Sequence, residues 1–185
     1  AVGATVGAAL KDADPMVRRR AAEALVRLGQ QPDRTSLAPV DDIYALLADE
    51  DRFVRWAGRI LLEQTPRADW QARVLTDTNH RSAPEAMVAW ARTVDGAGLQ
   101  PLIDRQLTLM AESGWSADDT LRLYRAFMLT TTLLPGEDGL AAAARARLHA
   151  LVNPRFPSAD ERVNREAALL LAYGGQPEAI GKILA

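Results

Sequence analysis

The stretch LKDADPMVRRRAAEALVRLG at residues 10–29 decides the fold, because its pattern returns as LADEDRFVRWAGRILLE at residues 47–63. Placing Val17 on Val54 aligns the aspartates, the arginine and the small residues of the two stretches, with an offset of 37 residues. A third copy, ADERVNREAALLLAYGG at residues 159–175, places Val163 in the same role. Self-similarity at such an interval predicts repeated units that pack on their neighbours.

Each copy has the periodicity of a helix. Apolar or small residues recur at intervals of three and four at Val17, Ala21, Ala24, Leu25 and Leu28, and again at Phe53, Val54, Ala57 and Leu61. This spacing places them on one side of a helix, whereas a strand would alternate. Two further repeats fit between the second and third copies, and Trp90 and Phe127 fall at the phase of the core.

The chain is therefore predicted to be all-α, a series of helix pairs in which the second helix carries the motif. The second helices are expected near residues 15–29, 52–64, 83–94, 117–134 and 159–173. The first helices are expected near 2–11, 38–48, 67–77, 97–112 and 138–152, and residues 177–185 open a sixth pair. We expect one domain, 1–185, with repeats at about 1–30, 31–65, 66–95, 96–135, 136–175 and, in part, 176–185.

Several helix starts carry residues that cap the first turn. Asp14 precedes Pro15, and proline suits the first helical position because it has no N–H to leave unbonded. Reciprocal capping boxes are expected for Ser82 with Glu85 and Ser158 with Glu161, and a weaker one for Ser116 with Asp119.

Aspartates stand before the motif helix and an arginine stands in its first turn. In the first copy these residues are Asp12, Asp14 and Arg18, and in the second they are Asp49, Asp51 and Arg55. They predict either a ladder of charge-assisted bonds between adjacent repeats or caps for the helix N-termini. Both interpretations are structural. Small residues such as Ala21 and Gly58 are expected to let neighbouring helices approach closely.

The stretches at residues 10–29 and 47–62 resemble HEAT-type repeats. The resemblance implies a right-handed α-α superhelix, a solenoid of about five HEAT-like helix pairs plus part of a sixth, of a kind used for protein binding. Residues 66–135 depart from the pattern, with Ala91 and Met128 where the motif has arginine. The curvature of that part is left open.

Residues 151–184 are similar to the HEAT-like region of large secreted bacterial proteins that join a propeller-type, dehydrogenase-like domain to a c-type cytochrome domain. The likeness is carried by Phe156-Pro157, Asp160-Glu161-Arg162 and Asn164-Arg165-Glu166. It implies a scaffold region excised from a longer exported polypeptide, and a start at Ala1 fits that expectation. A periplasmic or secreted location is favoured over a cytoplasmic one, but the absence of Cys leaves both open. The haem-attachment motif Cys-x-x-Cys-His is not in this sequence, so no haem is carried over.

Composition excludes several kinds of chemistry. The 185 residues include no Cys, which excludes disulfides, a thiol nucleophile and a thiolate metal site. His80 and His149 lie far apart in the chain and lack the spacing of a zinc site, so both are expected at the surface. A net charge of -2 lacks the basic footprint of a nucleic-acid binder, and no apolar run is long enough to span a membrane. We expect no catalytic residue, cofactor or metal.

The predicted motif helices are richer in arginine than in acidic residues, so the rest of the chain is acidic. In HEAT-like solenoids the second helices line the concave surface, so the resemblance implies a mildly basic groove that attracts acidic protein segments. The alternative is that these arginines are ordinary solvated side chains. Trp56 stands in an otherwise polar stripe, either as an interface anchor or packed on the neighbouring helix. The candidate protein-binding residues are Arg20, Arg52, Trp56, Arg59, Arg122, Arg125 and Arg162.

The sequence thus predicts a non-catalytic scaffold or protein-binding module. Its partner would be another protein or neighbouring domains of the same polypeptide. The alternative is an enzyme built on a HEAT-like frame, either DNA glycosylase-like or bilin lyase-like. A deep cleft that holds a carboxylate beside stacked aromatic rings would favour the enzyme.

Overall fold

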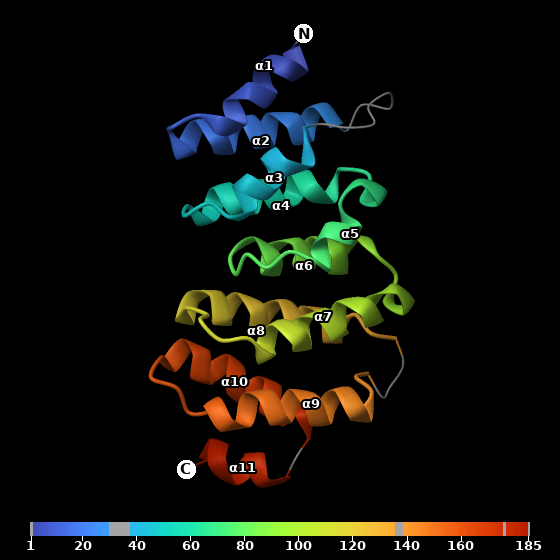
Figure 1. Ribbon diagram of the computed structural model, residues 1–185, viewed down its shortest axis with the longest axis vertical. Coiled ribbons are helices and arrows are strands. Elements are labelled where there is room, and N and C mark those ends of the chain that lie inside the picture. The colour runs from blue at the N-terminus through green and yellow to red at the C-terminus, as the bar shows by residue number, and fades with distance from the viewer. Residues whose placement is uncertain (1, 30–37, 136–138, 176, 185) are drawn as a thin grey trace. The chain divides into compact units, whose positions relative to one another are not determined.

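The computed structural model describes residues 2–29, 38–135, 139–175 and 177–184. Within these ranges the regular structure is helical and contains no strand, so the all-α prediction is confirmed. The chain forms two compact units, unit 1 (Ala1–Thr93) and unit 2 (Val94–Ala185) (Figure 1).

Unit 1 is built on motif helices that pack in chain order. Helix α2 (Pro15–Gly29) packs against α4 (Arg52–Glu63), and α4 packs against α6 (Ser82–Thr93). Helix α1 (Val2–Ala8) contacts α2, α3 (Val40–Leu47) contacts α4 and α6, and the short α5 (Gln71–Val74) contacts α6. The 3-10 turns η1 (Ala9–Lys11) and η2 (Arg67–Asp69) complete the unit.

Unit 2 has the same kind of pairing. The motif helices α8 (Ala117–Thr132) and α10 (Glu161–Gly174) pack on each other, and α7 (Gln100–Ala111) packs on α8 and on α9 (Ala142–Val152). Helix α9 also contacts α10, and α11 (Pro177–Leu184) contacts α10. The 3-10 turns are η3 (Gly96–Leu99) and η4 (Asn153–Arg155).

The helix pattern agrees with the sequence except at one element. A single helix was expected over residues 67–77, but the structure has the turn η2 and the four-residue helix α5. The cause is Trp70, which is buried and whose indole Nε1 donates to the Thr65 carbonyl oxygen at 3.0 Å. Holding this ring in the core bends the chain between the two short elements.

The core follows the predicted phase with two exceptions. Val54, Trp90 and Phe127 are buried as expected. The prediction was wrong for Val17, which is 37% exposed because it lines an open hollow between α1 and α2. It was also wrong for Phe53, which is 44% exposed at the N-terminal end of α4. Periodicity predicts the side of a helix, but not whether another helix covers the whole of that side.

Helix α6 is not capped as predicted. The carboxamide oxygen of Asn79 accepts from the backbone N–H groups of Arg81 and Ser82, at 2.9 and 3.1 Å. Ser82 already lies in the first turn of α6, and its hydroxyl donates to Asp77 at 2.6 Å. Asn79 is therefore placed to reach the first amides, and the predicted Ser82 capping box is wrong.

The two remaining capping boxes give different results. At α8 the Ser116 hydroxyl accepts from the Asp119 backbone N–H at 3.1 Å, which confirms that cap. At α10 the cap is Asp160, whose carboxylate accepts from the amides of Arg162 and Val163 at 2.8 and 3.3 Å. Ser158, predicted as the cap of α10, lies too early in the chain and accepts instead from the Asp160 amide at 3.3 Å.

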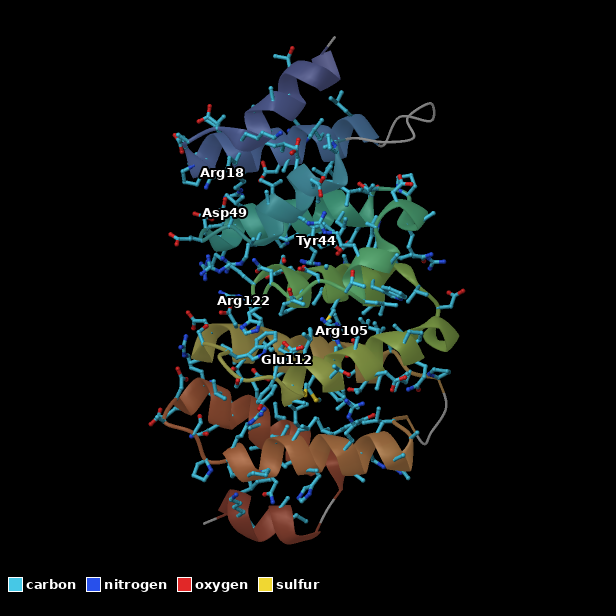
Figure 2. The ribbon with its side chains drawn as sticks, viewed as in Figure 1. Arg18, Tyr44, Asp49, Arg105, Glu112 and Arg122 are labelled. Atoms are coloured by element: carbon cyan, nitrogen blue, oxygen red, sulfur yellow. The ribbon has the colours of Figure 1, made fainter. Side chains whose placement is uncertain are left out.

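Arg18 forms the predicted bond between adjacent repeats. Its Nε and Nη2 lie 2.8 and 2.7 Å from Oδ2 of Asp49, in the loop before α4 (Figure 2). Its Nη1 donates to the carbonyl oxygens of Asp12 and Ala13 at 2.8 and 2.9 Å, in the loop before its own helix. The Arg18 guanidinium thus joins the loop before α2 to the loop before α4.

Arg55 repeats this arrangement one helical repeat further along the chain. Its Nη1 donates to the carbonyl oxygens of Asp49 and Glu50 at 2.7 and 2.8 Å, and its Nε lies 3.7 Å from Glu85 on α6. The other aspartate of this loop, Asp51, caps α4 by accepting from the Phe53 amide at 2.7 Å. The ladder and the caps were posed as alternatives, and the structure assigns them to different aspartates.

Candidate functional site

The seven residues predicted to bind protein fall in both units. Arg20 lies on α2 and Arg52, Trp56 and Arg59 on α4 of unit 1, whereas Arg122 and Arg125 lie on α8 and Arg162 on α10 of unit 2. In each unit these helices are direct neighbours. The structure therefore gives two arginine-bearing faces, and their surroundings differ.

The face of unit 1 contains a hollow between α2 and α4. Its volume is about 450 Å³, and its apolar walls are Val26, Ile60 and the indole of Trp56, which is 46% exposed. The buried Ala57 lies among these walls, and its small side chain leaves the space open. An indole that borders an open apolar space is available to a partner, because the described residues of unit 1 leave 46% of Trp56 exposed.

Arginines surround this hollow. Arg20 and Arg27 line it together with Glu23, and Glu23 is shared by Arg19 and Arg20 at 2.7 and 2.8 Å. The hydrogen bond from Arg19 is the main reason that the pKa of Glu23 lies below its usual range, and the bond from Arg20 adds to this. Glu23 is therefore a carboxylate at neutral pH. One carboxylate between two guanidinium groups leaves the rim of the hollow basic.

An exposed aromatic ring adjoins the same face. The guanidinium groups of Arg19 and Arg52 lie 5.1 and 4.6 Å from the centre of the Phe53 ring, one from α2 and one from α4. This stacking holds the two arginines beside an apolar surface. Met16, near the start of α2, is also exposed. We call the surface formed by Arg20, Arg27, Phe53, Trp56 and Ile60 the α2/α4 face.

Arg59 forms ion pairs with acidic residues of unit 1. It pairs with Glu63 on its own helix at 2.7 Å and lies 3.7 Å from Glu85 on α6. Arg92 reaches the same Glu63 at 3.1 Å. These pairs fasten α4 to α6, so Arg59 has a structural partner in addition to its predicted place on the binding surface.

The predicted residues of unit 2 are matched by carboxylates. Arg125 on α8 pairs with Glu166 on α10 at 2.9 Å. In the opposite direction, Arg162 on α10 pairs with Asp118 on α8 at 2.9 Å. Arg122 pairs with Asp119 one turn away. Arg125 and Arg162 thus join α8 to α10, and the basic surplus expected from the sequence lies mainly on unit 1.

Unit 2 holds a second hollow that sequence reasoning did not find. It has a volume of about 200 Å³ and lies between the C-terminal end of α7, the turn at residues 112–116, α8 and η4. Its lining includes Glu112, Trp115, Tyr124 and Arg155. Arg155 is distant in sequence from the other three, and its hydrogen bond to the Met110 carbonyl oxygen at the end of α7 brings it to this place.

The histidines and acidic residues give no metal centre. In the parts of the chain that the structure describes, no three His, Cys, Asp or Glu side chains are grouped as metal ligands. His149 was expected at the surface, but its Nε2 is shielded from solvent on α9. Among the described helices, none is both long and apolar enough to cross a membrane.

Comparison with protein-family models, with curated proteins and with solved structures gives no match to this chain. What defines the chain is therefore its own geometry, namely an all-α protein with two helical units and an arginine-rimmed aromatic face on unit 1.

Proposed function

We propose that this chain is a non-catalytic protein-binding or scaffold module of the HEAT-like solenoid kind, and that the α2/α4 face of unit 1 is its binding surface. The observation that carries the proposal is Trp56, 46% exposed beside a hollow of about 450 Å³ with arginines at its rim. Tryptophan and arginine are the residues most enriched at energetic centres of protein interfaces.

The chemistry of the face specifies its partner. The apolar walls formed by Val26, Ile60 and Trp56 suit one large apolar or aromatic side chain. The positive charges of Arg20, Arg27 and Arg52 outnumber the single negative charge of Glu23. The face therefore favours acidic residues on either side of that anchor. The partner is therefore an acidic protein segment that carries an apolar anchor.

The repeat architecture supports the same proposal. Motif helices of unit 1 pack in chain order and are joined through Arg18 and Arg55, as expected of stacked HEAT-like pairs. Such stacks present one row of helices as a continuous surface. In this arrangement α2 and α4 belong to the row that would line the concave side.

A peptide-display selection tests the proposal directly. The full chain is the bait, and the selected peptides are expected to combine Asp or Glu with an aromatic or large aliphatic residue. Their affinity is measured by fluorescence anisotropy against the wild type and Trp56→Ala. Removal of a central interface tryptophan costs about 2 kcal/mol or more, which corresponds to a loss of roughly thirtyfold.

A matched control separates a specific anchor from general stickiness. Leu169 on α10 is 51% exposed, so Leu169→Ala removes a comparable exposed apolar side chain from unit 2. This variant is expected to retain the wild-type affinity. If the selected peptides show no acidic bias, or bind Trp56→Ala as well as they bind the wild type, the α2/α4 face is not the binding surface.

The enzyme alternative would have to use the hollow of unit 2, where Glu112 lies beside Trp115 and Tyr124. Glu112 is 3.9 Å from Arg105, and the space of about 200 Å³ is smaller than the usual pocket for a drug-sized ligand, which is roughly 300–1,000 Å³. This geometry supports the binding of a small ligand better than it supports turnover of a nucleotide or a bilin.

A further inference from the structure

The hollow of unit 2 is lined by both apolar and polar groups. Met110 and Leu123 supply aliphatic walls, and Trp115 and Tyr124 supply aromatic ones. The turn that carries Trp115 passes through Gly114 at φ 85°, a left-handed conformation that glycine adopts without strain. The backbone therefore brings the indole back toward α8 and closes one side of the space.

Arg155 supplies a positive charge at the lining of the hollow. Its Nη1 donates to the carbonyl oxygen of Met110 at the end of α7. Carbonyl groups at a helix C-terminus carry partial negative charge, so this contact orients the guanidinium. A guanidinium has five N–H donors, and Arg155 borders the hollow with donors beyond the one that Met110 uses.

Tyr124 supplies a second donor. The residue is only 3% exposed, yet it lines the hollow, and its hydroxyl makes no hydrogen bond to another described residue. Burial raises the pKa of Tyr124, and Arg155 offsets that rise only in part. The phenol therefore keeps its proton at neutral pH and is able to donate to an acceptor in the hollow.

The charges at the hollow select for a single negative charge. Arg155 is positive, and Glu112 in the lining lies 3.9 Å from Arg105, so the carboxylate and this second arginine offset each other (Figure 2). A ligand with one negative charge balances Arg155. A dianion such as phosphate would instead place its second charge near Glu112.

The volume limits the size of the ligand. A space of about 200 Å³ corresponds to roughly seven water molecules at about 30 Å³ each. It therefore admits a short group of a few carbons or one aromatic ring in addition to the charged end. The walls formed by Leu123 and Trp115 match such a group in polarity.

We propose that this hollow binds a carboxylate that carries a short apolar or aromatic group. The carboxylate oxygens accept hydrogen bonds from the Arg155 guanidinium and the Tyr124 hydroxyl, and the apolar group lies against Trp115 and Leu123. Such a carboxylate has two sources, a free small acid or the carboxyl terminus of a peptide. The site is in unit 2 and is independent of the α2/α4 face.

The test is an NMR titration of the full ¹⁵N-labelled chain with sodium benzoate, compared with sodium chloride at equal ionic strength. The expected result is a saturable shift of the Gly114 amide and the Trp115 indole signals that chloride does not produce. A short peptide ending in phenylalanine is titrated as the free acid and as the amide. Binding of benzoate alone identifies a small acid, whereas binding of the peptide acid but not its amide identifies a peptide terminus.

Two variants and one control connect the signal to the proposed contacts. Tyr124→Phe keeps the ring and removes only the hydroxyl, so it is expected to weaken binding roughly tenfold, as for a lost hydrogen bond to a charged group. Arg155→Gln is expected to abolish saturation. Arg147→Gln, which alters an exposed arginine of α9 bonded to Thr108, is expected to leave binding unchanged.

The carboxylate-binding proposal can be refuted even if one variant is unstable. If neither benzoate nor the peptide acid produces a saturable shift, the proposal is wrong. It is equally wrong if Tyr124→Phe, whose buried ring remains in place, binds benzoate as tightly as the wild type. Circular dichroism of each variant confirms that a loss of binding does not arise from a loss of helix.

Discussion

Gly58 offers the sharpest test of how closely the helices of unit 1 pack. It is buried in the middle of α4, and a Cβ atom added there would lie 2.7 Å from the Cβ of Leu46 on α3. It would also lie 3.5 Å from Cδ2 of Leu47. Carbon atoms pack favourably at about 3.5–4.0 Å, so Gly58→Ala requires α3 to move away by roughly 1 Å.

Two opposing effects determine the size of the result. Replacing glycine by alanine inside a helix is worth up to about 1 kcal/mol, because the unfolded chain loses freedom and alanine favours the helix. Overpacking a close contact costs about 1–3 kcal/mol. The overlap involves the Cβ of Leu46, which cannot rotate away, so the cost is expected to exceed the gain. The net destabilisation is about 1–2 kcal/mol, or a Tm lower by roughly 2–8 °C for a chain of this size.

Thermal unfolding followed by circular dichroism measures this effect, and Gly181→Ala provides the matched control. Gly181 also lies within a helix, α11, but a Cβ added there would meet nothing within 4 Å. The control is therefore expected to keep or raise the Tm. If Gly58→Ala also keeps or raises the Tm, α3 and α4 do not approach as closely as the structure shows, and the role assigned to the small residue is refuted.

Two other predictions concern the arginines of the motif. Arg55→Met is expected to lower the free energy of unfolding by about 2–4 kcal/mol in denaturant titrations, because it removes the hydrogen bonds from the buried Arg55 to the backbone carbonyl oxygens of Asp49 and Glu50. A loss of stability no larger than that caused by replacing an exposed arginine would contradict this role. The hydrogen bonds from the Arg162 side chain hold the pKa of Asp160 at about 2, below its ordinary value of 3.8. The resulting stabilisation is present in full above pH 4 and is lost as the pH falls toward 2. Carboxyl NMR titration of Arg162→Ala is expected to show the midpoint of Asp160 moving back toward 3.8, and an unchanged midpoint would show that the side chain of Arg162 is not the cause.

Local sequence was enough to locate the helices, and it offered the ladder as one of two interpretations of the first-turn arginines. The 37-residue offset places Arg18 and Arg55 at the start of equivalent helices, and the structure gives both the same pair of loop carbonyl contacts. The caps were harder to predict, because Asn79 and Ser82 both suit a helix start and only backbone geometry selects between them. Trp70 divided a predicted helix because its burial outweighed local propensity.

The candidate sites depended far more on the fold. The sequence singled out Trp56, and the structure places it beside a hollow with a basic rim. The sequence could not show that Glu166 and Asp118 neutralise Arg125 and Arg162, since those partners lie about forty residues away in the chain. Nor could it show the hollow of unit 2.

What the sequence determined by itself is the all-α character and the phase of the helices. These follow from residues close together in the chain, whose spacing fixes which side of a helix they share. What only the tertiary structure decided is which charges are neutralised and which apolar surfaces remain open. Both depend on contacts between helices that are remote in sequence. A carboxylate within 3 Å neutralises Arg125 and Arg162, whereas Trp56 stays 46% exposed.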